Sequence, residues 1–368
     1  MLCGSKIVSM IYMIVYLTMN MTMIYKANRN NFVAIKTLVG LTKRTNIPKI
    51  VTQGGTFGPI ECANSIDKIG KKCYESGENL FVYKNIVRIL PLSYIDDLMT
   101  ISRCGIQSLK MNTFVGAQIE CKKLKFHTPD INGRSKCNFL HVGKTHIKCP
   151  ELKVHGSKIS KVSHETYLGD VLSDDGKNTK NVKNRISKGI GIISRIMRIL
   201  ESVTLGEHYF VTAMLLRETV FVNGILTNVE VWYGLKESEI DEFEALDKML
   251  LRKILKAPVS TPIESLYLEL GCLDIETIIK SRRLNYLHYL VTREEKEMLS
   301  LFFNTQWKYP NRKDWVEQVR SDLEDFDIPA NLDFIREKSH LSFKNLVKKH
   351  AKQKCLLKCL KRKAFTRK

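Results

Sequence analysis

Two adjacent aspartates, Asp96 and Asp97, lie between short apolar runs in the segment PLSYIDDLMTIS, residues 91–102. Asp is common in turns because its side chain can hydrogen-bond nearby backbone, so a solvated hairpin tip would explain the pair without any function. Two neighbouring carboxylates would otherwise repel each other unless a cation neutralised them. Mg²⁺ suits such a place, because it prefers oxygen ligands and is usually held by one or two carboxylates plus substrate phosphates. The pair by itself leaves both interpretations open.

Thiols and imidazoles form a second set of candidates. One group falls within thirteen residues and has zinc-ligand chemistry: Cys137, His141, His146 and Cys149. However, residues 136–142 alternate like a strand, which would hold Cys137 and His141 about 13 Å apart at ~3.3 Å per residue, too far to share one ion. Cys355 and Cys359, with His350 nearby, lack a fourth ligand. Ten cysteines without a C-x-x-C pair instead favour mostly buried thiols in a reducing compartment.

The charge of the chain is large and unevenly placed. Its 368 residues carry a formal net charge of +21. Residues 101–200 contribute +12 and residues 331–368 contribute +11, whereas residues 201–330 contribute −8. Positive charge that is concentrated in two regions of the chain indicates a polyanionic partner, either nucleic acid or an anionic membrane surface.

The N-terminal segment is unusual because residues 7–25 contain no charged side chain and five methionines. The length of this run permits a short membrane span, and Lys6 before it permits a signal peptide. Against both, polar residues interrupt the run and no small-residue cleavage site follows: Ser9, Thr18, Asn20 and Thr22. The sequence favours a partly buried helix, or a segment foreign to the original fold, over a membrane anchor.

The predicted secondary structure that must position these residues changes along the chain, from mixed strands and helices to helices alone. Residues 32–52 read as a hairpin, followed by a glycine-rich loop at 53–59 and a helix over 60–73. After the hairpin around Asp96 and Asp97, the pattern predicts a helix over 107–119, two strands flanking a turn at 130–133, and a strand–turn unit from Tyr167 to Gly176. From Val182 to Leu200 apolar residues recur at steps of three and four, and nearly everything beyond is helix-periodic. We therefore expect a mixed α+β segment followed by an all-helical one.

Read in order, these motifs resemble the reverse transcriptase of a non-LTR, LINE-type retrotransposon. The motifs are QGGTFGP at 53–59, YIDD at 94–97, KCNFLHVG at 136–143 and YLGD at 167–170, followed by a basic helix. The resemblance implies an α+β fold: a partial palm-type polymerase domain over 27–176, a thumb-like helical region over 177–270, a helical C-terminal region with a basic tail over 271–368, and a segment of uncertain origin over 1–26. It also implies RNA-directed DNA polymerase chemistry with an RNA template, a DNA primer, deoxynucleoside triphosphates and Mg²⁺, in the cytoplasm or nucleus.

The resemblance assigns roles residue by residue. Asp96 and Asp97 would be the catalytic, metal-binding carboxylates. Contacts to the nucleotide and template would come from Gln53, Gly54, Gly55, Phe57, Gly58, Pro59, Tyr94 and Lys136. Primer support would come from Tyr167, Leu168 and Gly169. The nucleic-acid backbone would be contacted by Lys180, Lys183, Lys188, Arg195 and Arg198, although a merely solvated charged helix face would have the same residues.

One departure from the family affects the expected activity. Palm-type polymerases hold two Mg²⁺ ions about 3.5–4 Å apart, and in the family a third aspartate upstream of the glycine-rich loop bridges them. The first acidic residue of this chain is Glu61, which follows that loop. We therefore expect the chain to correspond to the C-terminal part of a reverse transcriptase and to be inactive alone. A basic nucleic-acid-binding protein without catalysis, and a protein tethered to a membrane through residues 7–25, are the alternative functions.

Overall fold

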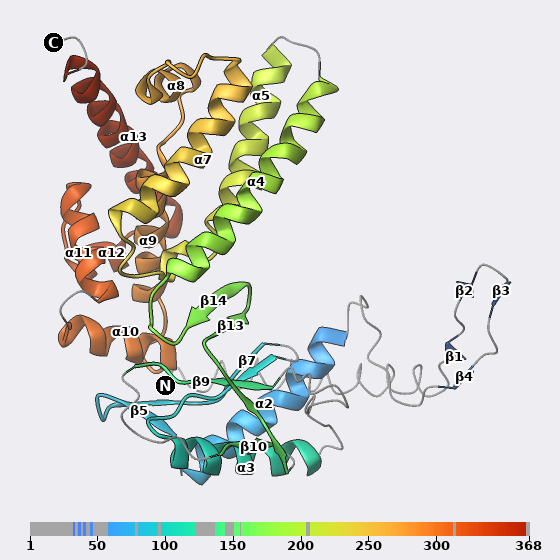
Figure 1. The fold of residues 1–368 in the computed structure, drawn as a ribbon. Helices are drawn as coiled ribbons and strands as arrows, with labels where there is room; N and C mark the ends of the chain where they lie inside the picture. The colour runs from blue at the N-terminus through green and yellow to red at the C-terminus, as the bar shows by residue number, and fades with distance from the viewer. Residues whose placement is uncertain are drawn as a thin grey trace. The chain divides into compact units, whose positions relative to one another are not determined.

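The structure of the protein is a computed structural model. It describes residues 58–77, 80–94, 97–121, 137–143, 151–154, 156–203, 207–311 and 314–365, together with four two-residue strands between residues 32 and 46. These residues are mostly helical, with a few short strand pairs (Figure 1). The architecture is therefore α+β, as the sequence predicts at that coarse level.

The described residues fall into two compact units. The first holds the four strands between residues 32 and 46 and the described parts of 58–81, 89–121 and 151–156. The second holds the described parts of 82–88, 137–143 and 157–365. The hairpin at 164–173, which the sequence analysis places at the end of the palm-like segment, belongs to the second unit.

The first unit is built on two helices and a hairpin. Helices α2 (Gly58–Ser76) and α3 (Gly105–Cys121) pack on each other, and β7 (Leu92–Tyr94) pairs antiparallel with β8 (Asp97–Met99). Strand β10 (Lys153–Val154) contacts α3. The core of this unit consists of Ile69, Cys73, Leu80, Met111, Val115 and Ile119, with Leu90, Leu98 and Phe114 packed against it.

Several short strands complete the β structure. Strand β1 (Phe32–Val33) pairs with β4 (Thr45–Asn46), and β2 (Lys36–Thr37) with β3 (Gly40–Leu41). Strand β5 (Phe81–Tyr83) pairs with β6 (Val87–Ile89), and β10 with β11 (Ser157–Lys158). In the second unit, β9 (Asn138–Leu140) and β12 (Ser160–Val162) are parallel, and β13 (His164–Tyr167) and β14 (Asp170–Ser173) are antiparallel.

The second unit continues as a helical assembly. Its first layer contains α4 (Thr179–Glu201), α5 (Glu207–Leu216), a π-helical segment Arg217–Val222, α6 (Asn223–Ile225), a 3₁₀ turn Val229–Val231 and α7 (Glu237–Leu255). Side chains of α4, α7 and the π-helical segment share one apolar core, which includes Val182, Phe221 and Phe243.

Six further helices follow: α8 (Ile263–Leu270), α9 (Ile275–Val291), α10 (Met298–Lys308), α11 (Trp315–Asp325), α12 (Leu332–Glu337) and α13 (His340–Phe365). Polar side chains cap several of them: Asp274 accepts from the backbone N–H of Thr277, and Asp314 from that of Glu317. Helix α13 runs along α9 and buries Phe343, Val347 and Ala351 at steps of four.

Most local predictions from the sequence are confirmed, with differences at the ends of the elements. The helices expected at 60–73, 107–119 and 182–200 are α2, α3 and α4. The expected hairpin at 32–52 returns at Thr45–Asn46, before the predicted return strand at 47–51, which lies outside the described residues. The unit expected to begin at Tyr167 is instead a hairpin whose turn is Leu168–Gly169. The two strands expected around the turn at 130–133 also lie outside the described residues.

No helix in the described part of the chain combines the length and the apolar character needed to cross a membrane. The uncharged run at 7–25 lies outside the described residues.

Candidate nucleic-acid interface

Helix α4 carries the basic residues that the sequence predicts as backbone contacts. Its apolar positions at steps of three and four form one buried face: Val182, Ile193, Ile196 and Leu200, together with Asn181, Arg185 and Gly189. This face packs on α5, α6 and α7. Gly189 lies where a side chain would not fit, because a Cβ there would approach Leu246 Cδ1 to 2.8 Å and Ile225 Cγ2 to 2.9 Å. The orientation of α4 is thus set by its packing.

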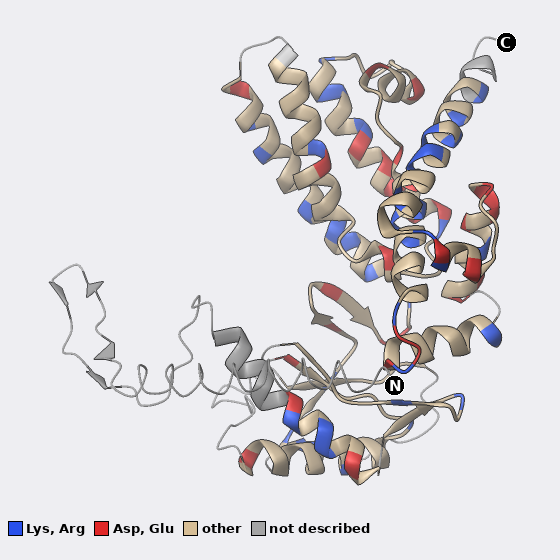
Figure 2. Cartoon of the chain, turned by 180° about the vertical axis from the view of Figure 1, so that it is seen from behind, with Lys and Arg blue, Asp and Glu red and all other residues tan. Residues whose placement is uncertain are grey.

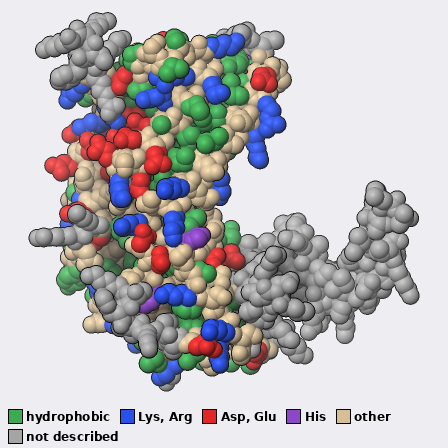
Figure 3. All heavy atoms as spheres, in the orientation of Figure 1, with side chains coloured by type: hydrophobic (Ala, Val, Ile, Leu, Met, Phe, Trp, Pro, Cys, Tyr) green, Lys and Arg blue, Asp and Glu red, His purple; other side chains and the backbone are tan. Residues whose placement is uncertain are grey.

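The opposite face of α4 is positively charged. The five predicted contact residues are all exposed: Lys180, Lys183, Lys188, Arg195 and Arg198. At 100° per residue they fall within an arc of about 140°, centred away from the buried positions, and they extend over about 27 Å along the helix axis. Figure 2 shows basic residues at successive turns of α4, and Figure 3 shows acidic side chains gathered on another part of the second unit. We call this surface the α4 basic face.

The hairpin β13–β14 is bound to the N-terminal half of α4. Arg185 Nη2 donates to Asp170 Oδ1 at 2.8 Å and to the carbonyl oxygen of Gly169 at 3.0 Å. Asn181 donates to the same carboxylate oxygen at 3.1 Å and accepts from the backbone N–H of Val171 at 3.0 Å. The residues predicted to support a primer, Tyr167, Leu168 and Gly169, therefore lie beside α4, with Leu168 exposed at the turn.

The hairpin predicted to carry the catalytic carboxylates is present, but only part of it is described. Tyr94 and Asp97 are directly opposite each other at the closed end of β7–β8, and both are exposed. Asp96 lies outside the described residues, so the predicted pairing of the two carboxylates around a metal stays a prediction. Beside this hairpin, Asp67, Lys71, Tyr74 and Ser93 help to line a depression of ≈ 360 Å³.

Most of the predicted nucleotide and template contacts lie outside the described residues. This applies to Gln53, Gly54, Gly55, Phe57 and Lys136. Gly58 and Pro59 form the first turn of α2.

The structure describes only some members of the candidate zinc groups. Strand β9 separates Cys137 from His141, in line with the extended spacing that argues against a shared ion, and His146 and Cys149 lie outside the described residues. Cys355 and Cys359 are buried on α13, where they pack with Leu251, Leu266 and Cys272. Their place in a core supports the interpretation as buried thiols.

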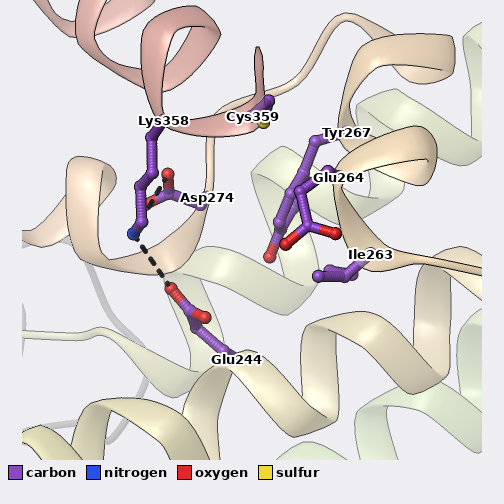
Figure 4. A pocket seen from close by; sticks show the side chains of 7 residues that line it. All are labelled: Glu244, Ile263, Glu264, Tyr267, Asp274, Lys358 and Cys359. Atoms are coloured by element: carbon purple, nitrogen blue, oxygen red, sulfur yellow. Dashed lines mark ion pairs between the residues drawn. The ribbon is translucent and has the colours of Figure 1, made fainter. Parts of the chain in front are cut away.

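The structure brings together three carboxylates that the sequence analysis missed. Oxygen atoms of Glu244, Asp274 and Glu276 lie within 4.8 Å of one another, an arrangement that could hold a metal ion. The ammonium group of Lys358 lies among them, 2.7 Å from Glu276. It lies 3.6 Å from Asp274 and 3.8 Å from Glu244, as Figure 4 shows for these two carboxylates. Carboxylates suit Mg²⁺, but here Lys358 already supplies a positive charge, and the cluster links α13 to α7 and α9.

This cluster gives the protein a defined acid sensitivity. Partial burial tends to raise the pKa of Glu276, but the hydrogen bonds and charges of Lys280 and Lys358 outweigh it and lower that pKa from 4.5 to about 2. A carboxylate with a depressed pKa stabilises the fold fully above its unfolded pKa, and this contribution is lost as the pH falls through the folded value. The contribution of Glu276 should therefore disappear between about pH 4.5 and pH 2.

We expect Glu276→Gln to lower the free energy of unfolding by about 1–2 kcal/mol at pH 7, since Glu276 is one-third exposed and solvent screens its ion pairs. Urea unfolding at pH 7, 4 and 3 should show the difference from wild type shrinking as the pH falls. The exposed Glu337→Gln is the matched control and should stay within about 0.5 kcal/mol of wild type at each pH. A loss of equal size at pH 7 and pH 3 would contradict the assignment.

No family model, no curated protein and no solved structure matches the chain. The resemblance to retrotransposon reverse transcriptases thus stands on the motifs in the sequence alone.

Proposed function

We propose that this chain binds the phosphate backbone of nucleic acid through the α4 basic face, as a protein derived from a non-LTR reverse transcriptase. The observation that carries the proposal is the placement of five exposed Lys and Arg side chains on one side of a packed helix. Lys and Arg neutralise phosphates and release the counterions condensed on nucleic acid, which favours binding. The length of the basic face, about 27 Å, corresponds to about eight base pairs at 3.4 Å each.

The binding test uses the purified full chain and fluorescently labelled 20-base-pair duplexes of two unrelated sequences, as DNA, as RNA and as RNA–DNA hybrid. Five phosphate contacts predict a slope of about −4.5 for log K against log salt on duplex DNA. Because phosphate contacts carry no base information, the two sequences should bind alike. Absence of binding at 50 mM salt, or an affinity that does not change with salt, would contradict the proposal.

Catalysis is the second part of the proposal, and we infer that this chain alone does not polymerise. A two-ion palm site needs a carboxylate across from the YIDD hairpin, and the chain offers none before Glu61, which lies on α2 after the glycine-rich loop. The residues present therefore do not fit a two-ion Mg²⁺ site, and Asp97 is an exposed carboxylate at the end of a hairpin.

We expect no primer extension by the purified chain on RNA or DNA templates with Mg²⁺ and all four deoxynucleoside triphosphates. Even a ~1 Å misplacement of a reacting group can cost ~10²-fold in rate, and a missing metal ligand is a larger defect. Asp96→Ala and Asp97→Ala should leave the assay at the same background. Templated extension that either substitution abolishes would show that a carboxylate elsewhere in the chain completes the site.

A further inference from the structure

One carboxylate oxygen of the cluster formed by Glu244, Asp274 and Glu276 lacks a hydrogen-bond partner. We call these three residues the carboxylate site. Asp274 caps α9 through Oδ1, which accepts from the backbone N–H of Thr277 at 2.8 Å, whereas its Oδ2 is buried and accepts no hydrogen bond. The whole side chain is only 3% exposed, so bulk water does not solvate this oxygen. A buried carboxylate oxygen without a partner is costly, so an occupant that binds it would stabilise the fold.

A cavity beside Asp274 has room for one small occupant. Its volume is ≈ 10 Å³, which is about that of a single water-sized sphere. Glu244, Asp274 and Lys358 line this cavity together with Glu264 and Tyr267. Figure 4 shows that the side chains of Glu244, Asp274 and Lys358 point toward one another, although they come from different parts of the chain. The size of the cavity restricts its occupant to one water molecule or one monatomic ion.

The charges around the cavity favour a cation over a water molecule. The ammonium group of Lys358 donates a hydrogen bond to Glu276 at 2.7 Å, but it lies 3.6 and 3.8 Å from the other two carboxylates of the site. Lys280 is 2.8 Å from Glu276 and also pairs with Asp325 at 2.9 Å. The three carboxylates and Asp325 therefore share two ammonium groups. Neighbouring carboxylates repel one another unless a cation neutralises them, so the site attracts further positive charge.

The ligand atoms suit a hard ion of the size of Ca²⁺. Ca²⁺ binds oxygen ligands at about 2.3–2.6 Å, so ligands on opposite sides of the ion are ~4.6–5.2 Å apart. Oxygen atoms of the carboxylate site lie within 4.8 Å of one another and fit around one such ion as they stand. Mg²⁺ requires its ligands at about 2.0–2.1 Å, in near-ideal octahedral geometry. Burial raises the pKa of the Cys359 thiol, which also lines the cavity, so the site offers oxygen ligands and not the thiolate that Zn²⁺ prefers.

Lys358 and a divalent cation would compete for the same oxygen atoms. Both are positively charged, and their repulsion at this distance would be strong. The Lys358 side chain is 27% exposed, so its ammonium group can turn toward solvent. Helix α13 is also held by the buried Cys355 and Cys359, which do not depend on the position of the ammonium group. Exchange of the lysine for an ion therefore does not require α13 to detach.

We propose that the carboxylate site binds Ca²⁺ and that Lys358 is a competitor of the ion built into the chain. In the absence of Ca²⁺ the ammonium group lies among the carboxylates, and on binding the ion displaces it toward solvent. A tethered competitor weakens the site, so the dissociation constant of the wild type should lie at about 10⁻⁴–10⁻³ M, the range of weak calcium sites. This inference goes beyond the proposed nucleic-acid binding and does not depend on it.

The first test is isothermal titration calorimetry of the full chain with CaCl₂ at constant ionic strength. Lys358→Met keeps the length of the side chain and removes the competing charge, so Ca²⁺ should bind about tenfold more tightly. Asp274→Asn retains the Oδ1 acceptor that caps α9 but removes the charge, so binding should weaken at least about tenfold. Asp333→Asn is the matched control, because it removes the same charge at a 78% exposed position, and it should bind Ca²⁺ as the wild type does.

A second variant and a second measurement cover the case in which Asp274→Asn does not fold. Glu244→Gln removes another ligand and should also weaken binding at least about tenfold. Burial tends to lower the pKa of Lys358, but the charges of Asp274 and Glu276 outweigh it and raise that pKa. Its release by Ca²⁺ should make the amine more reactive toward an acetylating reagent, by about twofold or more. The exposed Lys344 and Lys348 on the same helix should not change.

The outcomes decide between an ion and a water molecule in the cavity. Binding that Lys358→Met tightens and either carboxylate variant weakens, with a more reactive Lys358 in the wild type, supports the calcium site. No binding to the wild type or to Lys358→Met up to about 10 mM CaCl₂ would mean that the cavity holds water only, and would overturn the proposal. Binding that neither carboxylate variant changes would place the ion elsewhere in the chain and would overturn it as well. Each of these results leaves the proposed nucleic-acid binding as it stands.

Discussion

Neutralising the α4 basic face should abolish most of the affinity of the chain for nucleic acid. The variant replaces Lys180, Lys183, Lys188, Arg195 and Arg198 with Gln. All five side chains are exposed, so the helix should keep its packing. Removal of five phosphate contacts should make the slope of log K against log salt shallower by about 4.5 on duplex DNA. Between 50 and 200 mM salt, the wild-type affinity should then fall about 10²–10³-fold more steeply than that of the variant.

The matched control distinguishes an effect of the position of the removed charges from an effect of the net charge of the protein. It replaces five other exposed lysines with Gln and so carries the same net charge: Lys68, Lys253, Lys256, Lys296 and Lys308. Charges that do not touch the ligand act only over about a Debye length, roughly 10 Å at 0.1 M salt, so the control should keep nearly the wild-type slope. Equal slopes for the variant and the control would mean that binding follows overall charge and does not use α4.

The largest effect on stability should come from a buried ion pair in the helical part. Arg217, on the π-helical segment, is 1% exposed, and Asp247, on α7, is fully buried. The guanidinium group donates twice to this carboxylate, from Nε at 2.8 Å and from Nη2 at 2.6 Å, and Nη2 also donates to the carbonyl oxygen of Leu273 at 2.9 Å. Tyr267 donates to the same carboxylate at 3.2 Å. Burial raises the pKa of Tyr267, so its hydroxyl stays protonated as a donor.

Asp247→Ala should therefore lower the free energy of unfolding by about 3–5 kcal/mol, because it leaves the Arg217 cation buried without an anion. Urea unfolding followed by circular dichroism measures this loss. The double variant Arg217→Met with Asp247→Leu removes both charges and should be more stable than Asp247→Ala alone. Asp327→Asn weakens an ion pair with Lys354 in which the aspartate is 70% exposed. Asn tolerates the left-handed backbone of this position (φ +53°), so the substitution should cost less than about 1 kcal/mol. If the two single substitutions cost the same, the buried pair would not have the structural role described.

The parts of the fold that the sequence reveals are those determined by local pattern. The steps of three and four between Val182 and Leu200 predict the helix and much of its buried face, because neighbours on a helix face are close in sequence. Ile190 fits the same spacing but is 52% exposed. The YIDD hairpin is predicted for the same reason, since two short apolar runs around a short polar break indicate it, and β7 and β8 pair as expected. The boundaries are less well determined, as the turn at Leu168–Gly169 shows. Its left-handed leucine lies in a turn whose carbonyl oxygens accept hydrogen bonds from Arg185 and Asn228, which lie outside the hairpin.

The polar clusters could not be predicted, because their members are far apart in the chain. Asp170 ends the YLGD motif, but its donors Asn228 and Trp232 lie about 60 residues later. Lys358 meets Glu244 only because α13 packs on α9 and α8. Nothing in the local sequence distinguishes these residues from solvated charges. The exposed Lys and Arg of α4 were identifiable because they needed only the helix period and the position of the apolar face.

The most direct test of the proposed nucleic-acid interface is lysine protection in the unmodified protein. The full chain is treated with an amine-acetylating reagent, with and without a saturating 20-base-pair duplex at 50 mM salt, and each lysine is quantified by mass spectrometry. Lys180, Lys183 and Lys188 should become less reactive when the duplex is bound, while the exposed Lys296 and Lys308 should not change. Unchanged reactivity of the three α4 lysines in a protein that demonstrably binds the duplex would contradict the account.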